Sequence, residues 1–147
     1  MILWVLEDYF AEVADVQTAF LHGDLEEEIF IQIPTGYYEY LQEIDQKIEG
    51  NYLQLRKSTY GLVQAAHSWW KKFTTKLKTK LSFAQYQNDS CLLKRFDADG
   101  KVFLIVYVND CFVVGDQCAV KKALSEIEAL FNITQSDNIR DFIGCKI

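Results

Sequence analysis

The sequence is poor in the residues that build linkers and leader segments. Its 147 residues include one proline and seven glycines, and we find neither a low-complexity linker nor an internal repeat. A chain of this length fits one domain with a real core. The apolar run at residues 1–6 has no basic segment before it and is followed by Glu7 and Asp8. This pattern excludes a signal peptide and a membrane span, so we expect no membrane partner and a cytoplasmic or nuclear location.

Zinc-binding patterns are also missing. The four cysteines form no C-x-x-C pair, and His22 and His67 are the two histidines of the chain. A structural zinc site needs four cysteine or histidine ligands at suitable spacing, so we expect none. Reduced, mostly packed thiols are expected instead at Cys91, Cys111, Cys118 and Cys145.

Basic residues are scarce outside one segment. The net charge is −6, which argues against a generic nucleic-acid binder. Residues 1–50 hold twelve acids and one base, whereas residues 51–88 hold seven bases and no acid. The basic segment is either a solvated helix face or a surface that follows a phosphate backbone. Trp69, Trp70 and Phe73 lie between its basic residues, which are Arg56, Lys57, Lys71, Lys72, Lys76, Lys78 and Lys80.

Hydrophobic periodicity predicts an α+β fold with helices on one face of an antiparallel sheet. Apolar stripes predict helices at residues 62–81 and 117–131, and the end of another helix at residues 1–10. Residues 18–21 fit a tight turn or short helix, and residues 36–50 a loop with a short helical piece. Asn109 and Asp110 are expected to form the turn of a hairpin. Strands are expected at 13–16, 28–33, 52–55, 91–96, 102–108, 111–114 and 141–147.

Two carboxylates stand in apolar surroundings. Asp15 lies within an apolar strand, and Asp110 lies at the tip of a hydrophobic hairpin. A buried carboxylate is costly unless a cation or a polar partner compensates its charge. Asp15 could instead bond its own loop, and Asp110 could be an ordinary turn residue. A metal site formed by both residues is the functional alternative.

Four segments resemble the reverse transcriptases of copia-type long-terminal-repeat retrotransposons. Residues 15–29 (DVQTAFLHGDLEEEI) resemble the first palm motif of that family, and residues 55–69 (LRKSTYGLVQAAHSW) resemble the second. Residues 107–110 (YVND) resemble the metal-binding hairpin, and residues 142–147 (FIGCKI) a downstream palm segment. The segments occur in the family order across nearly the whole chain, which makes the set far more specific than any one of them.

The resemblance implies a ferredoxin-like palm and two-metal nucleotidyl transfer. In that chemistry Mg²⁺ or Mn²⁺ ions roughly 4 Å apart activate the primer hydroxyl and support the leaving pyrophosphate. Asp15 and Asp110 match the metal ligands. The hairpin of the family carries two aspartates, and this chain has Asn109 at the first of them. We therefore expect little or no activity from this copy.

The resemblance also implies an RNA or DNA template-primer and a deoxynucleoside triphosphate as partners. Phe20 matches the residue that stacks on the sugar, although a core phenylalanine would fit the pattern equally well. Tyr60, Gly61 and Gln64 match the nucleotide and template side of the second motif. A basic pair of that motif is altered here. Candidate contacts to the nucleic-acid backbone are Arg56, Lys57, Lys71, Lys72 and Lys76.

Residues 1–147 are expected to form a palm fragment without the N-terminal fingers of the family. The remaining parts of a polyprotein are then possible partners. Two alternatives to a defective polymerase stay open. One is a non-catalytic domain that binds nucleic acid or protein, and the other is an active enzyme completed by another chain.

Overall fold

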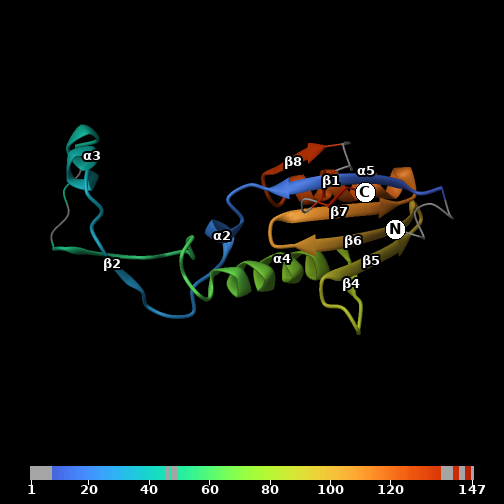
Figure 1. The fold of residues 1–147 in the computed structure, drawn as a ribbon, viewed down its shortest axis with the longest axis horizontal. Helices are drawn as coiled ribbons and strands as arrows, with labels where there is room; N and C mark the ends of the chain where they lie inside the picture. The colour runs from blue at the N-terminus through green and yellow to red at the C-terminus, as the bar shows by residue number, and fades with distance from the viewer. Residues whose placement is uncertain (1–7, 46, 48–49, 137–140, 143–144, 147) are drawn as a thin grey trace.

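An antiparallel sheet of six strands forms the centre of the molecule. The computed structural model describes residues 8–45, 47, 50–136, 141–142 and 145–146. The strand order is β4-β5-β6-β7-β1-β8, and every neighbouring pair is antiparallel (Figure 1). The strands are β1 (Phe10–Val16), β4 (Ala84–Gln85), β5 (Leu92–Asp97), β6 (Gly100–Tyr107), β7 (Asp110–Gly115) and β8 (Ile133–Ser136).

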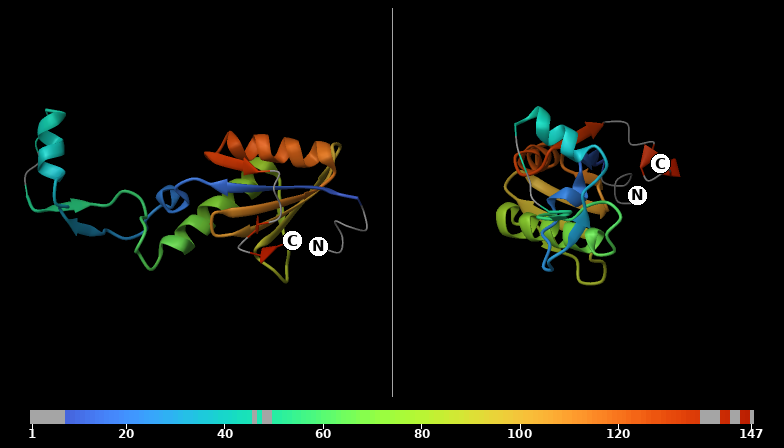
Figure 2. Two further views of the ribbon diagram at one scale, coloured as in Figure 1. Left: turned by 45° about the horizontal axis from the view of Figure 1, so that its top comes forward. Right: turned by 90° about the vertical axis from the view of Figure 1, so that its left-hand side faces the viewer.

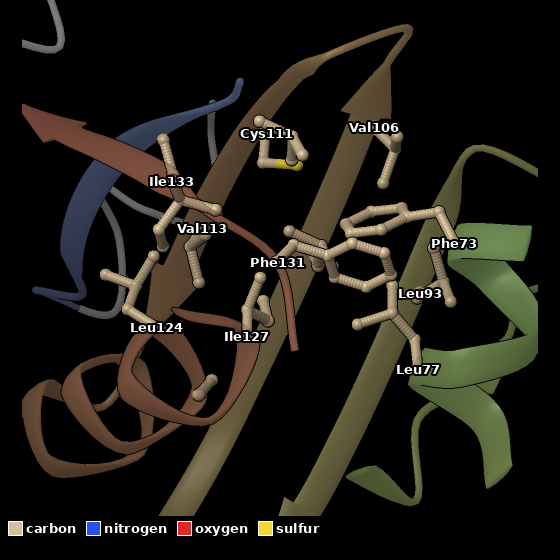
Figure 3. Close-up of a cluster of buried hydrophobic side chains, with 14 of the residues drawn as sticks. Phe73, Leu77, Leu93, Val106, Cys111, Val113, Leu124, Ile127, Phe131 and Ile133 are labelled. Carbon is tan, nitrogen blue, oxygen red and sulfur yellow. The ribbon is translucent and has the colours of Figure 1, made fainter. Parts of the chain in front are cut away.

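Two helices, α4 (Ala65–Leu81) and α5 (Gln117–Glu128), cover one face of this sheet (Figure 2). Both carry apolar residues at helical spacing, and these side chains meet the inward-facing residues of the strands. Figure 3 shows this core, in which Leu124 and Ile127 of α5 lie close to Val113 of β7, and Phe73 and Leu77 of α4 lie close to Leu93 of β5. The opposite face of the sheet, which we call the open face, carries the residues that alternate with this core set.

An arm extends away from the sheet (Figure 1). It follows the short helix α2 (Ala19–His22) and contains β2 (Phe30–Gln32), α3 (Tyr37–Glu43) and β3 (Tyr52–Gln54). β2 and β3 pair with each other in a separate two-stranded sheet. A further antiparallel pair is formed by β9 (Asp141–Phe142) and β10 (Cys145–Lys146). No helix in the described part of the chain is long and apolar enough to cross a membrane.

The α+β class and the helices on one face are confirmed. The helix expected at residues 1–10 is wrong at its described end, because Phe10 begins β1 and pairs with Gly115 of β7. Residues 1–7 lie outside the described part. The hairpin turn is also displaced. Tyr107 pairs with Asp110, so Val108 and Asn109 form the turn, with Val108 at a φ of 55°. The predicted turn relied on Asn and Asp as turn formers, and the sheet register overrides that local preference.

The cysteines fit the expectation only in part. Cys111 is buried, whereas Cys91 and Cys118 are exposed, and all three are free thiols. Burial raises the pKa of the Cys111 thiol. Cys91 immediately precedes β5, and Cys118 lies on the outer face of α5, so neither position points into the core.

Candidate active site

Asp15 and Asp110 face each other on neighbouring strands. Asp15 lies near the end of β1, Asp110 begins β7, and the two residues are directly opposite in the antiparallel register. Directly opposite residues project from the same face of a sheet. Their neighbours Ala14 and Cys111 are in the core beneath the helices, so both carboxylates belong to the open face. The structure thus brings together the two acids that the sequence singles out.

The Asp110 carboxyl group is influenced by its burial and by the charge of Asp15. Partial burial raises the pKa of the Asp110 carboxyl group, and the nearby Asp15 carboxylate raises it further. Burial disfavours the charged carboxylate by removing water, and the Asp15 carboxylate adds repulsion between like charges. A divalent cation between the two groups would reverse the balance by stabilising their ionised forms. The pair is therefore a candidate for binding a cation.

Asn109 contacts this pair directly. Its side-chain amide donates a hydrogen bond to the Asp15 carboxylate, and its backbone carbonyl accepts one from the Val16 amide at 2.9 Å. Asn109 thus lies where a further carboxylate would add charge to the site. Within the described residues, no group of three or more His, Cys, Asp or Glu side chains could hold a metal ion. The oxygen donors present are two carboxylates and one amide, which suit a hard divalent cation.

The expected nucleotide-binding residues gather beyond the end of β1. Phe20 lies on α2, and its ring centroid is 4.8 Å from that of Tyr60. Phe20 is packed against the core cluster, whereas Tyr60 is largely exposed. Gly61 has a φ of 93°, which glycine adopts without strain, and Gln64 donates a hydrogen bond to Glu27 at 3.2 Å. The second motif is therefore placed beside the first.

Three of the five expected nucleic-acid contacts are engaged in ion pairs. Lys57 and Lys72 both pair with Asp24, and Lys71 pairs with Glu26. Hydrogen bonds from Lys57 and Lys72 lower the pKa of the Asp24 carboxyl group, and Lys71 lowers that of Glu26. Among the described residues, neither Arg56 nor Lys76 has a salt bridge.

The acidic residues beside the basic ones were not singled out from the sequence. Asp24 and Glu26 line a cleft of about 430 Å³ together with Lys71, Lys72 and Lys76 of α4. The uneven distribution of charge along the chain was the signal that could have found them. This distribution shows that the acidic and basic residues come from different segments, but it does not show which acidic residue pairs with which basic one.

Comparison with known proteins shows the family of the chain. The family model described as reverse transcriptase (RNA-dependent DNA polymerase) matches residues 2–147. The chain is 34% identical over 141 residues to a retrovirus-related Pol polyprotein from transposon TNT 1-94 of Nicotiana tabacum. It is 28% identical over 131 residues to one from transposon RE2 of Arabidopsis thaliana, and 26% identical over 134 residues to a transposon Ty5-1 protein of Saccharomyces cerevisiae.

These matches cover 95%, 88% and 90% of this chain. They cover only 10%, 8% and 41% of the three relatives, so the chain spans a small part of the polyproteins that it matches. The matched part includes both palm motifs and the hairpin that carries Asn109 and Asp110. This chain belongs to the reverse transcriptase family of copia-type retrotransposon Pol polyproteins.

Proposed function

We propose that this chain carries the nucleotidyl-transfer site of its family in a weakened form. The observation that supports the proposal most directly is the pairing of Asp15 with Asp110 on the open face, with Asn109 bonded to Asp15. Asp15 and Asp110 would hold Mg²⁺ or Mn²⁺ through carboxylate oxygens, which both ions prefer. When bound, such ions supply activation of the primer hydroxyl and neutralise charge on the leaving pyrophosphate.

The remaining motif residues would bind the substrates, which are a template-primer and a deoxynucleoside triphosphate. Phe20 and Tyr60 offer adjoining aromatic rings to the sugar and base. Gly61 and Gln64 would lie on the template side. The basic residues Arg56, Lys57, Lys71, Lys72 and Lys76 would contact phosphates, with three of them first released from Asp24 or Glu26.

Asn109 is the reason to expect a weakened site. An amide oxygen can coordinate a cation, but it brings no negative charge. At ~4 Å and an effective dielectric typical of a protein surface, one charge pair is worth about 4 kcal/mol. A loss of that size in transition-state stabilisation corresponds to roughly a thousandfold lower rate. We therefore propose that polymerisation by this chain is weak or absent.

The test compares the unaltered chain with Asn109→Asp, Asp15→Asn and Asp110→Asn by Mn²⁺ titration and by primer extension on an RNA template. Asn109→Asp should bind Mn²⁺ more tightly, and each aspartate-to-asparagine variant should bind it more weakly. Equal Mn²⁺ affinity of Asn109→Asp and the unaltered chain would remove the ligand role of position 109. Robust extension by the unaltered chain would contradict the weakened site.

A non-catalytic binding domain derived from such a polymerase is the second candidate. It is favoured by the arm, where Phe30 and Tyr52 are 58% and 61% exposed on neighbouring strands. Large exposed aromatic side chains are common at interaction sites. The remaining parts of a polyprotein would be one such partner. This candidate would be preferred if Mn²⁺ bound equally weakly to the unaltered chain and to Asp15→Asn.

A further inference from the structure

We infer that Trp69 is a positioning residue that holds the β6–β7 turn, and with it Asn109 and Asp110, against the end of β1. The inference deepens the proposed function, because this turn carries one half of the proposed metal site. Trp69 lies on α4, on the opposite side of the sheet from the two carboxylates. It would therefore act through the backbone of the turn and not by contact with substrate.

The link is a hydrogen bond between a core side chain and the turn. The indole Nε1 of Trp69 donates to the backbone carbonyl of Val108 at 2.6 Å. Trp69 is only 1% exposed, and its ring is stacked on Phe73 and in edge contact with Phe131, at centroid distances of 4.9 and 5.4 Å. The packed ring cannot turn freely, so its single N–H group presents a donor in a fixed place.

Val108 is the residue that needs such support. Its φ of 55° lies in the left-handed region, which is unfavourable for a β-branched side chain. The Val108 side chain is 40% exposed, so burial does little to hold it in place. Backbone strain of this kind persists where the surroundings fix the conformation. The Trp69 N–H group donates to the Val108 carbonyl in this backbone conformation and so helps to hold it.

The turn is fixed from a second side by β1. Val16 donates its backbone N–H to the Asn109 carbonyl at 2.9 Å. The carbonyls of both turn residues are thus bonded, that of Val108 to α4 and that of Asn109 to β1. If the first bond is lost, Val108 can relax toward negative φ. Such a rotation would change where the Asn109 amide and the Asp110 carboxylate point.

The test removes the N–H group and keeps an aromatic ring. In Trp69→Phe, amide hydrogen exchange is measured at Val16, which bonds the turn, and at Asp116, whose amide bonds Lys101 at 2.9 Å at the far end of the β6–β7 pair. Mn²⁺ affinity is measured in parallel. Benzothienylalanine at position 69 provides a second variant, because it replaces N–H by sulfur within nearly the same ring shape. It keeps the experiment decisive if Trp69→Phe does not fold.

Loss of one hydrogen bond should make exchange at Val16 about five- to tenfold faster, with Asp116 little changed and Mn²⁺ bound several-fold more weakly. Phe73→Leu is the matched control, since Phe73 is a buried aromatic residue of the same helix without a bond to the turn. It should accelerate exchange at both amides in parallel.

If exchange became faster to the same extent at both amides in both Trp69 variants, Trp69 would be an ordinary core residue and the inference would be overturned. A selective change at Val16 without any Mn²⁺ binding by the unaltered chain would support the positioning role and contradict the proposed function instead.

Discussion

Gly23 and Ser58 approach each other so closely that a Cβ atom on Gly23 would lie 2.5 Å from the Ser58 Oγ atom. The same Cβ would lie 3.0 Å from the backbone nitrogen of Trp69. Ser58 is fully buried, donates its hydroxyl to the Phe20 carbonyl, and donates its backbone N–H to the Gly23 carbonyl at 3.0 Å. This contact joins the segment that carries Tyr60 to the helix that carries Phe20.

Gly23→Ala should therefore destabilise the protein. The methyl group would push against a buried hydroxyl and a helix backbone, and overpacking of this kind costs about 1–3 kcal/mol. Urea unfolding measures the loss in the free energy of unfolding. Ser58→Ala in the same background removes the closest contact, so the double variant should lose less than the sum of the two single variants. Additive losses would contradict a direct steric contact between the two positions.

Arg95 of β5 connects the C-terminal end of α4 to α5. Its guanidinium group donates to the Leu81 carbonyl at 3.1 Å and pairs with Glu126. The group also lies over the Phe83 ring, 4.9 Å from its centroid. Arg95 is 7% exposed, so its removal would leave the Leu81 carbonyl and the Glu126 carboxylate without this hydrogen-bond donor at a largely buried position.

We expect Arg95→Met to lower the free energy of unfolding by about 1–3 kcal/mol. The neighbouring Lys122 supplies the control. It is half-exposed and pairs with Asp97 and Asp99, so Lys122→Met should cost less than about 1 kcal/mol. Equal losses in the two variants, measured by thermal or urea unfolding, would show that burial of Arg95 does not decide its contribution.

The raised pKa of Asp110 predicts a specific pH dependence of stability. The folded protein holds the Asp110 proton more tightly than the unfolded chain, so the ionised carboxylate destabilises the fold. Asp110→Asn should thus be more stable than the unaltered chain at neutral pH. The difference should shrink as pH falls through the raised pKa toward the ordinary value of 3.8.

Asp24→Asn should change the stability in the opposite direction, because hydrogen bonds from Lys57 and Lys72 lower the pKa of Asp24. This variant should be less stable than the unaltered chain at neutral pH, with a difference that disappears as pH falls below 3.8. Thermal unfolding of all three proteins between about pH 3 and pH 7 measures both effects. If both variants were more stable, or both less stable, than the unaltered chain at neutral pH, the environments assigned to Asp110 and Asp24 would be contradicted.

Local sequence patterns could predict most of the fold. The apolar stripes of α4 and α5 and the alternating strands of the hairpin depend on residues near one another in the chain. The short edge strand β8 could not be predicted, because its formation depends on a distant partner: Val16 of β1 pairs with Ile133. The edge strand β4 has two residues, which are too few to show an alternating pattern. The left-handed φ of Val108 likewise follows from the sheet register and not from its own preference.

In the candidate site, too, some features could be predicted from local sequence and others depend on the fold. Asp15 and Asp110 could be predicted because each lies in a motif of its own, and the antiparallel pairing of β1 with β7 then brings them together. The bond from Trp69 to Val108 spans 39 residues, and the hydrogen bond from Lys72 to Asp24 spans 48. Charge counts indicate attraction between segments, but only the fold selects the partners. Three of the five expected phosphate contacts are consequently paired with acids, which composition does not reveal.

This neutralisation leads to a prediction about nucleic-acid binding. Asp24 and Glu26 hold Lys57, Lys71 and Lys72 in exposed ion pairs, and a phosphate backbone would have to displace these carboxylates. The double variant Asp24→Asn/Glu26→Gln keeps the side-chain shapes and frees the three lysines. It should bind a single-stranded RNA oligonucleotide more tightly than the unaltered chain at low salt, because neither carboxylate competes with phosphate any longer.

Fluorescence anisotropy at several salt concentrations measures this change. Each added phosphate contact should steepen the slope of log affinity against log salt by about 0.7, so three freed lysines should steepen it by about 2. The control is Glu39→Gln/Glu43→Gln on α3, which removes the same charge from the arm, away from the basic residues. If both double variants gain equally, the effect is one of net charge alone. If neither gains, the three lysines stabilise the fold and do not bind nucleic acid, because their release from the acids would then have created no phosphate-binding surface.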